Sequence, residues 1–233
     1  MKTIAHRGLS GLHPENPLEA FAAALRHQPD AMELDVQMTR DGRVVIFHDE
    51  TLDRLGKRPG WLKDCTYEEL RQLTVSVPLL EDYFRLIRDA QVETFVELKN
   101  SFIVYPRLEE KTLEIAQRYG RVQDCVFFSA NHHSVMRLRD ICPDVRLCFP
   151  FNDWIIDCGA YCAKRQVYIA MPYHLALTKD IVDDFHARNV AVYPWTVDEP
   201  AEMRRMAAMG VDGLLTNRVD VMKETLGEGE GRG

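Results

Sequence analysis

Residues 3–36 read TIAHRGLSGLHPENPLEAFAAALRHQPDAMELDV and contain one complete strand–helix–strand unit. Two short apolar segments, residues 3–7 and 31–36, are rich in residues that favour strands. The stretch between them carries apolar residues at helical spacing. A helix that links two strands in this way joins them in parallel, so the unit predicts an α/β fold.

The first helix has a readable start. Asn16 is expected to cap it, Pro17 suits the first helical position, and Glu19 completes a capping-box pattern. A late helix is expected to begin at Asp198 and Glu199, with Met203, Met206 and Ala207 on its buried face and Gly210 as its left-handed stop.

The same alternation continues to the end of the chain. Six further apolar strand-like runs occupy residues 94–99, 125–130, 146–151, 167–173, 191–197 and 213–217. Eight strands with intervening helices predict a (β/α)₈ TIM barrel, whose typical length is about 250 residues. The short run at 43–48 is expected to be a local excursion. An open doubly wound sheet is the alternative, but no Gly-rich turn for a dinucleotide follows the first strand.

Length and composition predict one domain. The chain has 233 residues, of which 46% are hydrophobic, which suffices for one sizeable core. We expect a single domain over residues 1–226, with an insertion after the second strand at about 51–78 that roofs part of the site. Residues 227–233 lack apolar anchors and are expected to form a flexible tail.

The net charge of −7 argues against nucleic acid or an anionic membrane surface as the main partner. No apolar run approaches the roughly 20 residues that a membrane span requires. Met1 leads directly into the first strand and leaves no room for a cleavable leader, so we expect a cytoplasmic protein without stable membrane insertion. The six cysteines are expected to be reduced core thiols. Whether the protein is a monomer or a homodimer is left open.

Acidic residues in two predicted strands point to a metal site. Glu33 and Asp35 lie two residues apart in one strand, so both carboxylates project to the same side. Glu97 and Lys99 do the same in the next regular strand. Three carboxylates at the ends of two strands predict an oxygen-rich site for one divalent cation, Mg²⁺, Ca²⁺ or Mn²⁺. The structural alternative is an internal ion pair, for example between Glu97 and Lys99.

Two histidines complete the predicted site, because His6 ends the first strand and His48 ends the short run after the second. Imidazoles titrate near neutrality and could act as the general acid and the general base of a phosphodiester cleavage. Arg7 and Lys99 would bind the phosphate oxygens. The other six histidines are interpreted as structural.

Several motifs, in matching order and spacing, resemble the glycerophosphodiester phosphodiesterase family over nearly the whole chain. They are Ala5-His6-Arg7-Gly8, Pro14-Glu15-Asn16, Glu33-Leu34-Asp35-Val36, Asp41-Gly42, His48-Asp49, Glu97-Leu98-Lys99, Phe128-Ser129, Trp195-Thr196-Val197 and Gly210-Val211-Asp212-Gly213. Only the insertion and the tail fall outside the resemblance.

The resemblance implies a barrel enzyme that hydrolyses glycerophosphodiesters to sn-glycerol 3-phosphate and an alcohol. It implies a divalent cation at Glu33, Asp35 and Glu97, with His6 and His48 as acid and base in an order left open. It also implies a first attack by the neighbouring glycerol hydroxyl, which gives a cyclic phosphate that water then opens. Trp195 would pack on the glycerol carbons, or else be a core aromatic of the barrel.

The chain departs from the family pattern at several positions. Pro17 replaces the usual Thr, and residues 28–31 replace the commoner Gly-Ala-Asp. Asp198 stands where Asn is usual, and Asn217 stands in place of the Asp of a Thr-Asp turn. Two alternatives remain: a lysophospholipase D, with an acyl groove lined by Phe149-Pro150-Phe151 and Trp154, or a phosphate-ester binding protein without turnover.

Overall fold

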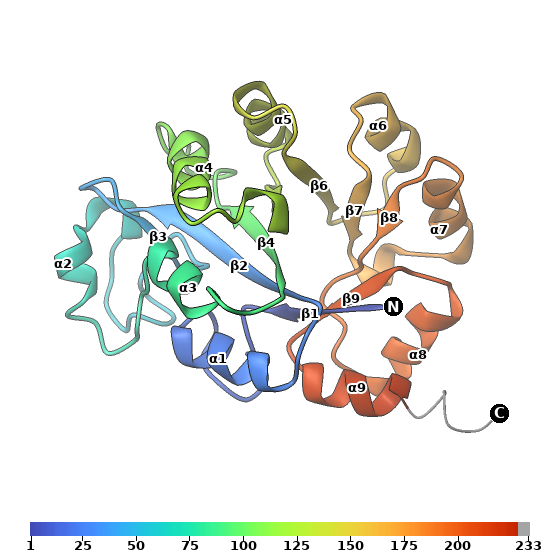
Figure 1. Cartoon of the computed structure of the whole chain (residues 1–233), viewed down its shortest axis with the longest axis horizontal. Coiled ribbons are helices and arrows are strands. Elements are labelled where there is room, and N and C mark those ends of the chain that lie inside the picture. The colour runs from blue at the N-terminus through green and yellow to red at the C-terminus, as the bar shows by residue number, and fades with distance from the viewer. Residues whose placement is uncertain (228–233) are drawn as a thin grey trace.

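Eight parallel strands form a barrel within residues 1–227, the part of the chain that the computed structural model describes. The helices surround these strands on the outside (Figure 1). The strand order along the sheet is β8-β7-β6-β5-β4-β2-β1-β9, and β3 pairs antiparallel with β2. The predicted TIM-barrel fold is therefore confirmed, as is the local character of the short strand β3.

The strands are β1 (Lys2–His6), β2 (Ala31–Met38), β3 (Val44–Ile46), β4 (Glu93–Leu98), β5 (Cys125–Phe128), β6 (Arg146–Phe151), β7 (Ile169–Pro172), β8 (Ala191–Val192) and β9 (Gly213–Thr216). The α-helices are α1 (Leu18–Arg26), α2 (Tyr67–Leu70), α3 (Leu80–Leu86), α4 (Leu108–Arg118), α5 (His132–Ile141), α6 (Cys158–Lys164), α7 (Lys179–His186), α8 (Pro200–Ala208) and α9 (Val219–Gly227). Short 3₁₀ turns occupy Leu62–Asp64, Val122–Asp124 and His174–Ala176.

Alternation along the strands sorts side chains between the inside and the outside of the barrel. In β2, Leu34 and Val36 pack outward against the helix layer, in the largest apolar cluster. Residues such as Ile4, Phe95 and Met171 point inward and form a separate small cluster. Toward the carboxyl ends of the strands, the side chains that point into the barrel become polar. Glu33 and Glu97 line a cavity there.

The barrel closes between β8 and β9 without a regular ladder. Three backbone hydrogen bonds join the segments: Asp212 N to Val192 O at 3.0 Å, Leu215 N to Pro194 O at 3.0 Å, and Val197 N to Leu215 O at 2.9 Å. The seventh predicted strand, 191–197, is regular only at its first two residues, which form β8. Pro194 lacks an N–H and cannot extend the ladder.

The expected insertion after β2 has its own small core. Leu52, Leu62 and Leu70 pack there with Val45 and Phe47 from the strand region. Its predicted short helix is α2, which Thr66 and Glu69 begin with a full capping box.

One helix start was predicted wrongly. Asn16 does not cap α1: its φ is 72°, in the left-handed region, and its Nδ2 donates to Asp35 Oδ2 at 2.9 Å. Pro17 occupies the N-cap position, and no side chain caps the helix. The late helix begins as expected after Glu199, and Gly210 has the expected positive φ, 78°.

Other expectations have mixed outcomes. All six cysteines are free thiols and five are buried. No helix of residues 1–227 is long and apolar enough to cross a membrane. The predicted tail lies outside the described residues except for Gly227, which ends α9.

Candidate active site

A cavity of about 280 Å³ opens at the carboxyl ends of the barrel strands. His6 is the last residue of β1, Glu33 lies in β2, and Glu97 and Lys99 lie at the end of β4. Because parallel strands end on the same rim, their terminal side chains converge. All the residues singled out by the sequence except Asp35 line this cavity: His6, Arg7, Glu33, His48, Glu97, Lys99 and Trp195.

Asp35 lies directly behind the cavity and completes a group of three carboxylates. One oxygen from each of Glu33, Asp35 and Glu97 lies within 4.8 Å of the other two. Glu33 and Asp35 are 1% and 0% exposed, so their charges have almost no contact with solvent. Burial, together with the charge of Asp35, raises the pKa of Glu33 well above its usual value. Burial also raises the pKa of Glu97.

Two cations face these carboxylates. Arg7 Nε lies 3.2 Å from Asp35 Oδ2, and Lys99 Nζ lies 3.2 Å from Glu97 Oε1 and 3.8 Å from Asp35 Oδ1. Although burial disfavours its charged form, Asp35 has a pKa held below its usual value by Arg7 and Lys99. The ion pair of Glu97 with Lys99, anticipated as the structural alternative, therefore exists within the carboxylate group.

A chain of hydrogen-bonded polar side chains contacts His6 on the side of its Nδ1. Its Nδ1 lies 2.7 Å from Asn217 Oδ1, and Asn217 Nδ2 donates to Asp198 Oδ2 at 2.7 Å. Its Nε2 lies 3.8 Å from Glu33 Oε2 at the cavity wall. Burial, followed by the charge of Arg7, lowers the pKa of His6 to about 4, so the ring is neutral at pH 7.

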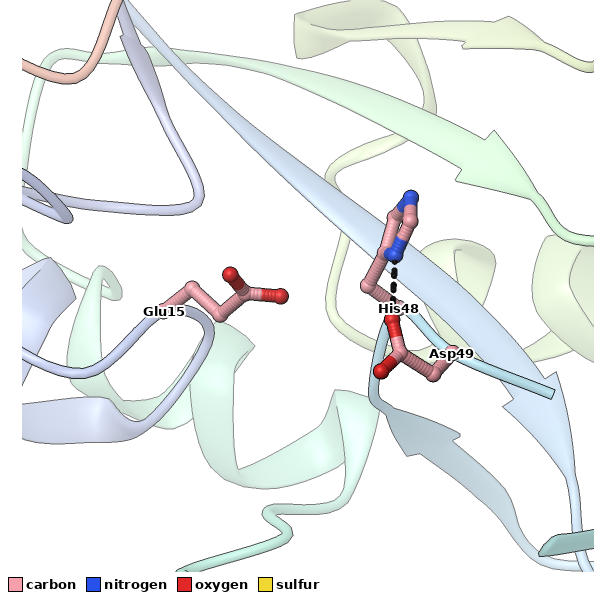
Figure 2. Close-up of side chains that lie close together, drawn as sticks. All are labelled: Glu15, His48 and Asp49. Atoms are coloured by element: carbon pink, nitrogen blue, oxygen red, sulfur yellow. Dashed lines mark hydrogen bonds and ion pairs between the residues drawn. The ribbon is translucent and has the colours of Figure 1, made fainter. Parts of the chain in front are cut away.

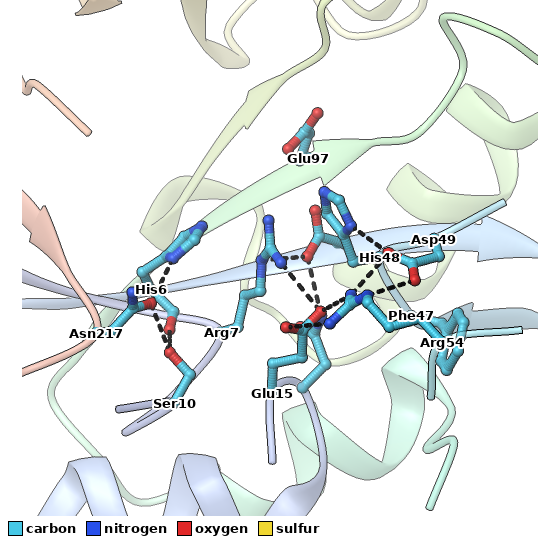
Figure 3. A network of polar contacts seen from close by, with 12 residues as sticks. His6, Arg7, Ser10, Glu15, Phe47, His48, Asp49, Arg54, Glu97 and Asn217 are labelled. Atoms are coloured by element: carbon cyan, nitrogen blue, oxygen red, sulfur yellow. Dashed lines mark hydrogen bonds and ion pairs between the residues drawn. The ribbon is translucent and has the colours of Figure 1, made fainter. Parts of the chain in front are cut away.

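His48 has a different support. Its Nδ1 donates to Asp49 Oδ1 at 2.8 Å, and Glu15 lies beside this pair (Figure 2). Arg54, from the insertion, binds Asp49 at 2.7 Å and Glu15 at 2.6 Å, as Figure 3 shows. Glu15, His48 and Asp49 are close enough to suggest a second metal site. The guanidinium of Arg54 already occupies both carboxylates, so we interpret this group as an ion-pair network.

Trp195, which follows strand β8, also lines the cavity. Its Nε1 donates to Met171 O at 2.9 Å, which fixes the ring. The ring is partly exposed to the cavity and packs on Tyr173, with centroids 5.5 Å apart. Trp195 thus lines the cavity and also packs against the inner apolar cluster of the barrel. Its contact with the glycerol carbons stays a prediction.

The carboxylate group fits a divalent cation. When all three carboxylates are ionised, they face two cations, and one negative charge is left for a bound cation to compensate. Asp35 Oδ1 is buried and has no hydrogen-bond partner among residues 1–227. Such an orphaned oxygen in an all-oxygen donor set suits a hard cation such as Mg²⁺, Ca²⁺ or Mn²⁺.

Comparison with known proteins identifies the family. The model of the Glycerophosphoryl diester phosphodiesterase family matches residues 6–221, from the first site histidine into α9. The chain belongs to this family. The resemblance drawn from the motifs is thereby confirmed, together with the expectation of a glycerophosphodiester phosphodiesterase.

Relatives of this phosphodiesterase match over almost their full lengths. A glycerophosphodiester phosphodiesterase of Bacillus altitudinis is 35% identical, covering 94% of this chain and 95% of that protein. One from Caldanaerobacter subterraneus is 32% identical, covering 93% and 95%. The structure of an Oleispira antarctica phosphodiesterase in complex with the product sn-glycerol-3-phosphate shares the fold, with a TM-score of 0.89, 21% identity and 97% of each chain covered.

Sequence reasoning missed several residues of the phosphodiesterase site. Glu15 and Asp49 were noticed only as parts of motifs, and Arg54 lay unremarked within the insertion. Asp198 was noticed as a helix start and as a departure from the family pattern, and Asn217 only as such a departure. A carboxylate directly after His48 was the available signal for Asp49, because histidines at active sites are commonly oriented by carboxylates.

Proposed function

We propose that the protein hydrolyses glycerophosphodiesters to sn-glycerol 3-phosphate and an alcohol, using one divalent cation. The observation that carries this proposal is the convergence of three carboxylates, two cations and two histidines at one barrel cavity. The bound product in the Oleispira antarctica phosphodiesterase, which shares the fold, supports the same choice of product.

Glu33, Asp35 and Glu97 would hold the cation. When bound, it would offset negative charge on the phosphate and lower the pKa of a neighbouring hydroxyl group. The chain's own cations have a complementary role, because Arg7 and Lys99 remain at the cavity wall and can bind phosphate oxygens. The guanidinium of Arg7 is held at this wall by Asp35 and by Glu15, whose Oε1 accepts from Arg7 Nη1 at 3.0 Å.

The two histidines are suited to different proton transfers, one as the general base and the other as the general acid. Neutral His6 faces the cavity with Nε2 and can accept the proton of the attacking glycerol hydroxyl. His48 Nδ1 donates to the carboxylate of Asp49, which orients the ring for proton donation to the departing alkoxide. Attack by the neighbouring hydroxyl gives a cyclic phosphate, which water opens with the two roles reversed.

Product analysis tests this function. Glycerophosphocholine and glycerophosphoethanolamine are incubated with the protein and Mg²⁺, Ca²⁺ or Mn²⁺, beside the variants Glu97→Ala and His48→Ala. We expect release of sn-glycerol 3-phosphate that stops on chelation and is lost in both variants. Ligand affinity without metal-stimulated turnover would instead identify a binding protein.

A second candidate, a lysophospholipase D, is favoured by an apolar groove beside the cavity. The groove, of about 400 Å³, shares Ala130, Pro150 and Asn152 with the cavity and continues along Ile155 and Ile156. Of the groove residues expected from the sequence, Pro150 and Phe151 line it, whereas Trp154 lines a neighbouring hollow. Phe149 does not: it is fully buried and stacks on His132, with ring centroids 4.1 Å apart.

The groove could hold an acyl chain while the same catalytic groups cleave the phosphodiester. Rates on lysophosphatidylcholine and glycerophosphocholine separate the two candidates. A higher kcat/KM on the lysolipid identifies a lysophospholipase D, and a higher value on the deacylated diester identifies the leading function.

A further inference from the structure

Asp198 lies outside the cavity but is joined to His6 through a single side chain. It accepts three hydrogen bonds: from Thr216 Oγ1 at 3.1 Å, from the backbone N–H of Asn217 at 2.8 Å, and from Asn217 Nδ2 at 2.7 Å. Asn217 Oδ1 in turn lies 2.7 Å from His6 Nδ1 and 2.7 Å from Ser10 Oγ. Figure 3 shows Asn217 between Ser10 and the imidazole.

The chemistry of these groups fixes the proton on His6. A carboxylate only accepts hydrogen bonds, so the NH₂ of Asn217 must face Asp198 and its oxygen must face His6. An amide oxygen also only accepts, so Nδ1 of the imidazole must carry the hydrogen. The unprotonated nitrogen of the neutral ring is then Nε2, the atom on the cavity side.

We propose that Asp198 is a positioning residue that acts through Asn217 to select the tautomer and orientation of His6. This inference rests on the proposed function, in which Nε2 accepts the proton of the attacking hydroxyl. The alternative tautomer would present an N–H to the cavity and remove that acceptor.

The two positions that depart from the family pattern are therefore in direct contact. Asp198 and Asn217 form a matched pair, in which one side chain is a carboxylate and the other an amide. Either order provides an acceptor for His6 Nδ1 and satisfies the bond between the two side chains. Changing only one residue breaks this complementarity.

The single substitution Asp198→Asn tests the proposal. In the wild type the backbone N–H of Asn217 binds Asp198 Oδ1 and its side-chain NH₂ binds Oδ2. The amide that the substitution introduces has an oxygen at only one of these places and an NH₂ at the other. If its oxygen keeps the bond to the backbone N–H, its NH₂ faces the NH₂ of Asn217, so the Asn217 amide is expected to flip. Its NH₂ then faces His6 and forces the hydrogen to Nε2. We expect kcat to fall about 10²-fold, within the usual contribution of general acid–base catalysis, while KM stays nearly constant.

The double variant Asp198→Asn/Asn217→Asp restores a matched pair, because the new amide at position 198 donates to the new carboxylate at position 217, which accepts from His6. We expect its kcat to be at least about tenfold higher than that of Asp198→Asn. Two independent sites would not show such coupling. A double variant no more active than Asp198→Asn overturns the proposal.

Asp212→Asn is the matched control. Asp212 Oδ2 accepts from the backbone N–H of Val192 at 2.7 Å, at the opposite end of the same barrel seam. It lacks any link to His6, so its loss is expected to reduce thermal stability but not kcat. An equal loss of kcat in both single variants would show a structural effect and overturn the proposal.

Nitrogen-15 NMR of the metal-free protein gives a readout that does not depend on activity. The His6 ring shifts are expected to show Nδ1–H in the wild type and the double variant, and Nε2–H in Asp198→Asn. The same tautomer in all three overturns the proposal even if the wild type hydrolyses its substrate. Wild-type inactivity with the expected shifts would contradict the proposed function alone.

Discussion

Replacement of Glu33 by Gln is expected to stabilise the metal-free protein while it removes the response to metal. The side chain is 1% exposed, and one oxygen from each of its two carboxylate neighbours lies within 4.8 Å. At an effective dielectric constant of 20, two unit charges 4.8 Å apart repel by about 3.5 kcal/mol. Gln keeps the oxygen that accepts from the backbone N–H of Arg7, a bond of 3.1 Å in the wild type.

Arg7 offsets part of that repulsion, so we expect a net gain of about 1–2 kcal/mol in the free energy of unfolding with chelator present. This gain corresponds to a rise of roughly 2–8 °C in Tm for a chain of this size. A divalent cation at 100 times its Kd should stabilise the wild type by about 2.7 kcal/mol. The same cation concentration should stabilise Glu33→Gln far less.

The contribution of Glu33 to the stability of the metal-free protein depends on pH in a definite direction. Burial and the charge of Asp35 raise the pKa of Glu33 in the folded protein, so the folded state binds more protons than the unfolded state. Its contribution to stability is therefore present below the usual pKa of a glutamate and is lost as the pH rises through the folded value. The advantage of Glu33→Gln over the metal-free wild type should accordingly grow with pH.

Urea unfolding at several pH values, with chelator and with added Mn²⁺, measures these quantities. Glu109→Gln is the matched control, because Glu109 is 4% exposed and accepts from Asn100 Nδ2 at 2.9 Å and Ser134 Oγ at 2.6 Å, outside the carboxylate group. That variant keeps the accepting oxygen but loses the negative charge that strengthens both bonds, so it should lose stability and keep the metal response. The electrostatic reasoning is refuted if Glu33→Gln loses as much stability in chelator as the control, or if Mn²⁺ stabilises it as much as the wild type.

Three further predictions concern the rest of the site. Lys99→Met should raise KM for glycerophosphocholine by about 10-fold or more through loss of a charge-assisted phosphate contact, without weakening cation binding by calorimetry. Arg54→Gln should change the free energy of unfolding by less than about 1 kcal/mol, because the side chain is half exposed. It should nevertheless lower kcat, since Asp49 then orients His48 less firmly. Ile156→Ser should lower kcat/KM on lysophosphatidylcholine by roughly 10-fold and leave glycerophosphocholine hydrolysis unchanged, if the groove binds an acyl chain.

The sequence was most informative where local periodicity decides the structure. The period of two along β2 placed Glu33 and Asp35 on one side and Leu34 and Val36 on the other, and the structure has this arrangement. The rule that parallel strands end on one rim then brought Glu97 to the same cavity.

The features that were missed depend on partners far away in the chain. Asn16 was expected to cap a helix, but Asp35, 19 residues later, binds its side chain. Arg54 binds Glu15 across 39 residues, and this contact requires the insertion to fold over the site. No local pattern encodes such pairs. The roles of Asp198 and Asn217 likewise became visible only when the two strand ends met at the barrel seam.

Anomalous diffraction from a crystal soaked in Mn²⁺ tests the central claim most directly, because it locates the cation. The account predicts one strong peak per chain, ligated by carboxylate oxygens of Glu33, Asp35 and Glu97. A peak at Glu15, His48 and Asp49, or no peak at the barrel cavity in a crystal whose protein is active in solution, would contradict it.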